Sequence, residues 1–274
     1  MLMKNPGKDI TIHANGINIC YDDSGGEGIP LIFIHGFPFD KSMWQPQADF
    51  FKMKRRVITY DIRGYGKSLS NKDEETISLY ADDLVNLLDV LDIPRVIACG
   101  LSMGGYILLD AVNRYRERFE GIVLSDTQCI ADSPEAREKR HQTIQQIESE
   151  GTTNFAEGFI KNIFCADSLE HKKPITEKIK NVILSTKPAT IIATLRALAG
   201  RIERCSTLEI LDIPTLVICG KEDKITPVVQ SEFLKNNIPG STLALIAAAG
   251  HMSNLEQPDI FNSHLARFLD TLTR

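Results

Sequence analysis

The stretch Val96-Ile97-Ala98-Cys99-Gly100-Leu101-Ser102-Met103-Gly104-Gly105 decides the fold. An apolar run typical of a buried strand leads directly into a G-x-S-x-G motif, and residues predicted to be helical, 105–114, follow it. This order predicts a nucleophile elbow, a sharp turn that exposes Ser102 at the carboxyl edge of a parallel sheet. Glycine suits positions 100 and 104 because a Cβ there would clash with neighbouring backbone. The adjoining helix N-terminus would favour an oxyanion formed beside the serine.

Similar apolar runs recur along the chain and predict a sheet. Seven further segments have strand patterns: 9–14, 17–21, 30–34, 56–60, 121–125, 214–219 and 242–246. Asn15-Gly16, between the first two, predicts a type I′ hairpin. Helical patterns lie between later runs, most clearly over 76–91, where leucines recur at three- and four-residue spacing. Strands that alternate with helices predict a mostly parallel, eight-stranded α/β sheet flanked by helices.

The region after the sixth predicted strand has a different character. From about 129 to 208, amphipathic helical segments follow one another without a buried strand. We therefore expect a helical cap inserted into an α/β core, with residues 1–127 and 209–274 forming the core and 128–208 forming the cap. One long helix, over about 253–272, is expected to close the chain.

The composition excludes several classes of protein. The 274 residues are 43% hydrophobic, which is typical of a globular chain and not of a disordered one. Because the chain has 31 basic and 36 acidic residues, a nucleic-acid partner is not expected. The longest apolar run, 243–249, is too short to span a membrane. The first eight residues lack the apolar segment of a secretory signal, so we expect a soluble, cytoplasmic protein without a membrane partner.

The cysteines and glycines give no sign of a metal or a nucleotide. Six cysteines are spread along the chain without a C-x-x-C pair: Cys20, Cys99, Cys129, Cys165, Cys205 and Cys219. In a cytoplasmic protein they are expected to be reduced and partly buried. Gly64 and Gly66 are not followed by the third glycine of a G-x-G-x-x-G phosphate loop. We therefore predict neither a metal nor a cofactor.

An activated serine needs a base, and in folds with this elbow the chain order is serine, acid, histidine. Downstream of Ser102, His141 and His171 lie in charged stretches of the insertion, and His264 lies within the last helix. His251 follows the last predicted strand, so its loop would lie at the same edge of the sheet as the elbow. We predict that His251 is the base.

Three carboxylates compete for the role of orienting this base. Asp223 lies just beyond the strand 214–219 and is the favoured candidate. Glu222 is adjacent to it but lies one residue nearer the strand. Asp126 follows the strand 121–125 at the same edge, and its alternative role is to accept hydrogen bonds from local backbone. The acid would fix the tautomer of the histidine and stabilise its protonated form.

The oxyanion of a tetrahedral intermediate needs two N–H donors. One is the N–H of Met103, the residue after the serine, and the second comes from the loop after the third strand. That loop reads His35-Gly36-Phe37-Pro38, so the N–H of Phe37 is the candidate, because Pro38 has none. His35 is expected to hold the loop by hydrogen bonds of its side chain.

These motifs, together with Asp61-Ile62-Arg63-Gly64-Tyr65-Gly66-Lys67-Ser68, resemble the α/β-hydrolase superfamily. The likeness is to its small cofactor-free carboxylesterases and lactonases, including the 3-oxoadipate enol-lactonase-like group, and it covers essentially the whole chain apart from the cap. The resemblance implies that the quoted segment is structural and that Asp61 and Arg63 brace loops near the elbow. It also implies the roles of nucleophile for Ser102, acid for Asp223, base for His251 and oxyanion donors for Phe37 and Met103.

The serine at the elbow argues against haloalkane dehalogenases and epoxide hydrolases, which resemble this fold but have an aspartate there. We therefore predict a serine hydrolase that cleaves small carboxylic esters or lactones through an acyl-enzyme, with this small molecule as its partner. Hydrolysis of a C–C bond and peracid formation are alternatives for the same site. An alternative from another class is a sensor with this fold, which turns over slowly or once and reports a small molecule to a partner.

Aromatic residues near the site suit a mostly apolar substrate group. The candidate pocket residues are Trp44, Phe155, Phe159 and Phe164, and the alternative role of the phenylalanines is to pack the cap onto the core. Over 129–208 the chain has 12 Lys and Arg against 10 Asp and Glu, so a strongly anionic substrate is neither demanded nor excluded. A carboxylate would need an arginine in the pocket, and the sequence does not place the three candidates, Arg137, Arg140 and Arg196.

Overall fold

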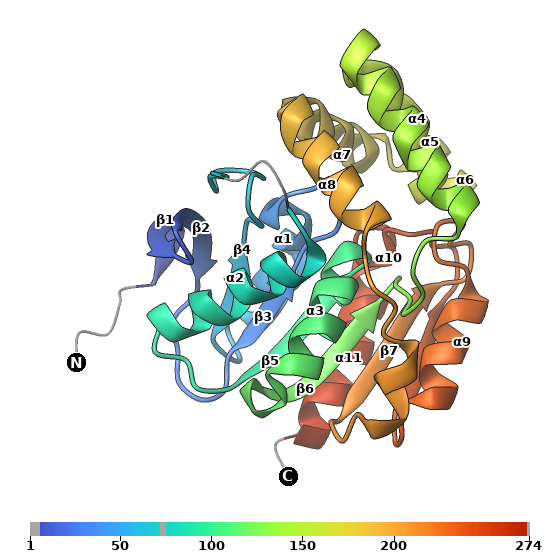
Figure 1. The fold of residues 1–274 in the computed structure, drawn as a ribbon. Coiled ribbons are helices and arrows are strands. Elements are labelled where there is room, and N and C mark those ends of the chain that lie inside the picture. The colour runs from blue at the N-terminus through green and yellow to red at the C-terminus, as the bar shows by residue number, and fades with distance from the viewer. Residues whose placement is uncertain (1–5, 72–74, 273–274) are drawn as a thin grey trace.

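A single sheet lies at the centre of the computed structural model, which describes residues 6–71 and 75–272 (Figure 1). The first five residues of the segment examined for a secretory signal lie outside these described residues. Within the described part, eight strands form the sheet: β1 (Gly7–Ala14), β2 (Ile17–Asp23), β3 (Leu31–Ile34), β4 (Val57–Tyr60), β5 (Val96–Leu101), β6 (Phe119–Ser125), β7 (Thr215–Gly220) and β8 (Thr242–Ile246).

The strands follow the order β1-β2-β4-β3-β5-β6-β7-β8 across the sheet. β2 pairs in antiparallel fashion with β1 and with β4, and the other neighbouring strands are parallel. Asn15 and Gly16, which join β1 to β2, have φ values of 46° and 77°, the left-handed conformation that a type I′ turn requires. The prediction of a mostly parallel, eight-stranded α/β sheet is confirmed.

Parallel pairing brings the carboxyl ends of the central strands to one edge. In the register, Ile34 of β3 lies opposite Gly100 of β5, and Ser125 of β6 lies opposite both Leu101 of β5 and Ile218 of β7. The loops that follow these strands therefore begin side by side, although they come from distant parts of the sequence. Open α/β sheets place their ligand sites at this edge.

Helices cover both faces of the sheet. Figure 1 shows α2 and α3 crossing in front of the strands and α11 behind them. In the core, the helical elements within the described residues are η1 (Lys41–Trp44), α1 (Gln45–Phe51), α2 (Ile77–Val90), α3 (Met103–Arg114), η2 (Arg116–Arg118), η3 (Cys205–Ile210), α9 (Val228–Asn237), α10 (Ser253–Glu256) and α11 (Pro258–Leu272).

Helix α2 illustrates how local sequence sets an element. The side chain of Thr76 accepts a hydrogen bond from the N–H of Leu79 at 3.0 Å, which caps the first turn. Leu84, Leu87 and Leu88 recur on one face and are buried against the core. Burial of a leucine side chain contributes about 1.5–3 kcal/mol, so this apolar face anchors the helix to the sheet.

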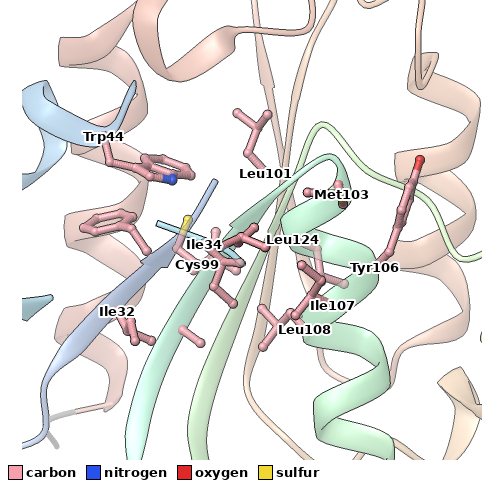
Figure 2. Packing of buried hydrophobic residues seen from close by; sticks show 14 of the residues in the cluster. Ile32, Ile34, Trp44, Cys99, Leu101, Met103, Tyr106, Ile107, Leu108 and Leu124 are labelled. Carbon is pink, nitrogen blue, oxygen red and sulfur yellow. The ribbon is translucent and has the colours of Figure 1, made fainter. Parts of the chain in front are cut away.

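The core lies between the sheet and these helices. Figure 2 shows residues of this core: Ile32 and Ile34 on β3, Leu124 near the centre of the view, and Ile107 and Leu108 on α3. All five side chains are fully buried. Strands that are buried on both faces need continuous apolar sequence, which explains why these runs do not alternate with polar residues.

Five helices, here called the cap, lie between β6 and β7. They are α4 (Pro134–Glu150), α5 (Thr153–Ile163), α6 (Ala166–His171), α7 (Lys173–Ser185) and α8 (Pro188–Ala199). Figure 1 shows them at the top of the view, outside the layers that flank the strands. Buried residues such as Ile144, Ile160, Ile183 and Ile191 give these helices an apolar side of their own.

The expectation that all six cysteines are reduced is wrong for two of them. A disulfide joins Cys129, in the loop that leads into the cap, to Cys205, just after the cap, with Cα atoms 5.0 Å apart. The N–H of Arg204 also donates to the carbonyl of Cys129 at 2.8 Å. Because the cap begins and ends at the same place on the core, residues 76 positions apart become neighbours. The remaining cysteines are free and buried: Cys20, Cys99, Cys165 and Cys219.

The single closing helix predicted over 253–272 is also wrong. The chain forms two helices there, α10 and α11, separated at Gln257. Pro258 begins α11 and has no N–H to continue the hydrogen bonds of α10. The proline favours the first turn of a new helix instead.

Among the described residues, no single helix is long and apolar enough to cross a membrane. One bent pair, α7 with α8 at 95°, reaches the required length and composition only when the two helices are taken together.

Candidate active site

Ser102 lies in a sharp turn between β5 and α3. Its φ of 54° and ψ of −113° are unfavourable for a residue with a Cβ, so the surrounding packing must hold them. A Cβ on Gly100 would lie 2.3 Å from the carbonyl oxygen of Gly104, and a Cβ on Gly104 would lie 2.3 Å from that of Ile34. Neither distance admits an atom. The two glycines therefore allow the turn to close, and Ser102 remains 8% exposed.

The loop after β3 packs against this turn. A Cβ on Gly36 would lie 3.3 Å from the Cβ of Ser102. The ring of His35 holds the loop, because its Nε2 accepts the N–H of Ile62 and its Nδ1 donates to the carbonyl of Gly36, both at 2.9 Å. Burial lowers the pKa of His35, which favours this neutral tautomer. Phe37 follows directly on this fixed loop.

The segment 61–68 ties neighbouring loops together. The carboxylate of Asp61 accepts the N–H groups of Lys41 and Lys67 at 2.9 and 3.0 Å. Arg63 is fully buried, and its Nε and Nη2 donate to the two oxygens of Asp83 on α2 at 2.8 and 2.6 Å. Asp61 thus braces the chain just after the β3 loop, whereas Arg63 is anchored to α2.

His251 and Asp223 meet at the carboxyl edge of the sheet. Asp223 follows β7 and His251 follows β8, and Nδ1 of the histidine lies 2.8 Å from Oδ2 of the aspartate. The N–H groups of Ile225 and Thr226 donate to Oδ1 of Asp223 at 2.8 and 3.0 Å, and the hydroxyl of Thr226 donates to Oδ2 at 2.8 Å. The carboxylate is therefore fixed by its own loop before it contacts the imidazole.

The charges of this buried pair depend on each other. Burial disfavours the protonated imidazole of His251, but the nearby carboxylates, Asp223 first among them, outweigh burial and raise the pKa of His251 above its ordinary value. Burial also disfavours the charged form of Asp223, and the attraction of His251 together with the hydrogen bonds lowers the pKa of Asp223. The pair is thus arranged to stabilise an imidazolium that faces a carboxylate.

Asp126, the alternative acid, has other partners. Its Oδ2 accepts the hydroxyls of Ser125 and Ser253 at 2.8 and 2.5 Å, and its Oδ1 accepts the N–H of Gly220 at 2.9 Å. Burial, and then the charge of Asp223, raises the pKa of Asp126 to about 7. Asp126 therefore links the end of β7 to α10, while the imidazole bonds to Asp223.

Asp126, Asp223 and Cys219 also have ligand atoms within 4.8 Å of one another, a spacing that a metal ion would fit. The carboxylate oxygens already accept several hydrogen bonds from Ser253, Gly220 and Thr226. Burial raises the pKa of the Cys219 thiol, which disfavours the thiolate that binds metals. We assign no ion to this cluster.

The other candidates lie away from this pair. Glu222 is exposed, although its neighbour Asp223 is buried. His141 and His171 are exposed on cap helices, and His264 is partly buried in the middle of α11.

Comparison with known proteins decides the family. The family described as alpha/beta hydrolase fold matches residues 29–258. This chain belongs to the α/β-hydrolase family. The hydrolase is 32% identical to 3-oxoadipate enol-lactonase 2 of Acinetobacter baylyi over 92% of this chain and 93% of that protein.

Solved structures agree with this hydrolase over nearly its full length. A thermophilic esterase from Thermogutta terrifontis, solved with malate bound, has a TM-score of 0.91 and 33% identity over 98% of this chain and 99% of that one. The enol-lactonase from Burkholderia xenovorans has a TM-score of 0.89 and 28% identity over 95% of this chain and all of that one. The cap and the core therefore share one arrangement with these proteins.

A cavity of about 590 Å³ lies between the cap of the hydrolase and its core. Phe37 from the β3 loop, Tyr106 from α3 and Ile225 beside Asp223 line its core side. Phe155 and Phe159 of α5 line the cap side, and their ring centroids lie 6.1 and 6.0 Å from that of Phe37. The cavity thus borders the candidate oxyanion loop and the acid loop.

Two of the predicted pocket residues are not in the lining of this cavity. Trp44 is fully buried in the core (Figure 2). Its ring centroid lies 4.7 Å from that of Phe33 and 6.0 Å from that of Phe261. Phe164 is 1% exposed and lies in the turn between α5 and α6, with its backbone against Gly250. Packing between distant elements sets the direction of both side chains. A local aromatic pattern does not reveal that direction.

The cavity also has charged residues in its lining, and the sequence alone did not show which of the arginines would lie there. Arg140 on α4 lines it, and its Nε donates to Oδ2 of Asp132 at 2.5 Å. Arg201 donates from Nη1 to Oδ1 of Asp132 at 2.5 Å. Of the other two arginines considered, Arg137 is exposed, and Arg196 pairs with Glu148 at 3.4 Å on the surface of the cap.

Proposed function

We propose that this hydrolase cleaves small carboxylic esters or lactones, with Ser102 as nucleophile, His251 as base and Asp223 as the acid that orients the base. The observation that carries the proposal is the 2.8 Å contact between Nδ1 of His251 and Asp223, at the same sheet edge as the serine elbow. With the Nδ1 proton donated to the carboxylate, the lone pair of Nε2 is left to accept a proton.

The proposed reaction has two halves. His251 takes the proton of the Ser102 hydroxyl as the oxygen attacks the acyl carbon, and the resulting oxyanion accepts hydrogen bonds from the N–H groups of Phe37 and Met103. The imidazolium then gives its proton to the leaving alkoxide, which leaves an acyl-enzyme. Water, deprotonated by His251, attacks this ester and releases the carboxylic acid and the free serine. In a lactone, the alcohol and the acid leave as one molecule.

Each oxyanion donor is expected to supply about 3 kcal/mol of transition-state stabilisation. Two features support the assignment of Phe37 and Met103. Met103 is the first residue of α3, where N–H groups have no partner within the helix. The contact between Gly36 and Ser102 brings the loop of Phe37 next to the serine.

The cavity suits a small acyl group. Its volume of about 590 Å³ and its wall of Phe37, Phe155 and Phe159 favour a compact substrate with an apolar part. The names of its relatives, an enol-lactonase and an esterase, support the same class of reaction at an acyl–oxygen bond.

A panel of p-nitrophenyl acetate and butyrate and of γ-lactones of graded chain length tests this function. We expect multiple turnovers on at least one ester or lactone, and a loss in kcat of roughly 10⁴-fold or more in Ser102→Ala. Multiple turnover that survives Ser102→Ala would contradict the proposal. So would a purified protein that binds these compounds but completes no more than one turnover.

A further inference from the structure

A buried carboxylate joins the cap to the loop of His251. Glu256 ends α10, shortly after His251 in the sequence, and is 1% exposed. Its Oε1 accepts the N–H of Gly250 at 2.7 Å, and its Oε2 accepts the N–H of Cys165 at 2.9 Å. Cys165 occupies the position just before the first residue of α6. One side chain thus holds backbone of the core and backbone of the cap at the same time.

The two backbone segments also touch each other directly. The N–H of His251 donates to the carbonyl of Ile163 at the end of α5, at 2.8 Å. A Cβ on Gly250 would lie 2.9 Å from both the carbonyl oxygen of Ile163 and the nitrogen of Cys165. Lys172, between α6 and α7, donates to the carbonyl of Glu256. The turn between α5 and α6 and the loop of His251 therefore form one hydrogen-bonded unit.

We propose that Glu256 is a positioning residue for His251. Its carboxylate holds the loop of His251 in place by binding that loop to the turn between α5 and α6. The inference rests on the proposed function, because it gives Glu256 an effect on rate only if His251 is the base. Glu256 acts through the backbone of Gly250 and Cys165 and is not in the lining of the substrate cavity.

Glu256 also contributes to the charge around the imidazole. The carboxylates that face His251 come from three elements: Asp223 after β7, Asp126 after β6 and Glu256 on α10. Around Glu256 itself, the charged and titratable groups are Lys172 and the Cys165 thiol. Burial disfavours a charged His251, and the three carboxylates together raise its pKa. Removal of the charge of Glu256 should therefore lower that pKa.

The test is Glu256→Gln. Glutamine has one acceptor oxygen and an NH₂ group, so one of the two backbone N–H groups would lose its acceptor and face a donor. We expect kcat on p-nitrophenyl acetate to fall about 10- to 100-fold, as for a misplaced catalytic group, while KM changes less than about two-fold. The acid limb of the kcat/KM profile should move to lower pH, which a purely structural role would not produce.

A second variant separates position from charge. Glu256→Asp keeps the charge but is one methylene shorter, so it cannot reach both N–H groups. We expect a lower kcat with the acid limb close to that of the wild type. This variant also decides the question if Glu256→Gln does not fold, because a wild-type kcat in Glu256→Asp would overturn the inference.

Glu75→Gln is the matched control. Glu75 is a buried carboxylate that accepts hydrogen bonds from the hydroxyls of Ser70 and Tyr80, and it belongs neither to the pair at His251 nor to the cavity lining. The kcat of the Glu75→Gln variant should stay within about two-fold of that of the wild type. An equal loss in Glu75→Gln would overturn the inference, as would a wild-type kcat and acid limb in Glu256→Gln. Activity that survives Ser102→Ala would instead defeat the proposed function itself.

Discussion

The core and the cap are held by different kinds of contact. In the core, backbone meets backbone, and an added Cβ at Gly100 or Gly104 would lie 2.3 Å from a main-chain oxygen. In the cap, Gly158 in the middle of α5 has no heavy atom within 4 Å of the place where a Cβ would lie. The core thus holds the turn of Ser102 through main-chain contacts, while side chains of the cap line the cavity. We infer that chemistry and selectivity are divided between them.

Several contacts join the two regions. The disulfide between Cys129 and Cys205 closes the base of the cap. The hydroxyl of Tyr65 donates to Thr194 of α8 at 2.8 Å. Glu256 and the loop of His251 bind the turn between α5 and α6. Of these three contacts, only the last reaches the loop of His251, so the core and the cap are least separate there.

The largest expected effect tests the reacting groups of the core. Asp223→Asn should lower kcat by about 10⁴-fold, because the amide would favour the wrong tautomer of His251. Asp126→Asn should cost less than about 100-fold, because the hydrogen bonds of Asp126 go to Ser125, Gly220 and Ser253, whereas the imidazole bonds to Asp223. Steady-state kinetics of both variants on one ester check this. A larger loss at Asp126 would make Asp126 the orienting acid.

A glycine-to-alanine substitution in the core and one in the cap compare how each region affects the free energy of unfolding. Gly104→Ala should lower the free energy of unfolding by about 1–3 kcal/mol, because the new methyl group overlaps the carbonyl of Ile34. Gly158→Ala should raise it by roughly 0.5–1 kcal/mol, because alanine is the better helix former and meets nothing there. Urea unfolding measures both. Equal destabilisation by the two changes would remove the contrast between core and cap.

The wall of the cavity gives a smaller and more selective effect. Phe159→Ala should lower kcat/KM on p-nitrophenyl butyrate by about 10-fold and on the acetate by less than about three-fold, because the longer acyl chain loses apolar contact. Trp44→Phe, in the core and outside the cavity lining, is the control and should leave this ratio unchanged. If Phe159→Ala lowers both rates equally, Phe159 packs the cap and does not select the substrate.

The smallest effect concerns pH. The base must be neutral to take the proton of Ser102, so kcat/KM should fall as pH drops through the pKa of His251. The nearby carboxylates raise that pKa above the ordinary value of about 6.5, so the acid limb should lie above pH 6.5. A pH profile on a substrate without titratable groups measures the limb. Activity that stays level down to pH 4 would argue against His251.

Much of the core could be predicted because its signals are local. Each central strand is a continuous apolar run, and the elbow needs glycines at fixed distances from Ser102. Asp223 and His251 are found from their places after two strands, since parallel strands bring such loops to one edge.

The cap and its junctions could not be predicted in the same way. Trp44 and Phe164 are aromatic residues of the type that lines apolar pockets, yet contacts with distant elements turn them into the interior. Cys129 and Cys205 are paired because the cap returns to its starting point, which their spacing does not reveal. Asp132 likewise pairs with Arg140 and with Arg201, and Arg201 reaches it only because the chain returns after α8. Pro258 was a local signal for the break between α10 and α11.

Covalent labelling tests the central claim most directly. The purified protein would be treated with a fluorophosphonate, and the adduct would be mapped by peptide mass spectrometry. We expect one adduct, on the peptide that contains Ser102, that is absent in Ser102→Ala and forms far more slowly in His251→Ala. Labelling of a different residue, or an equal rate of labelling in His251→Ala, would contradict the claim that this histidine activates this serine.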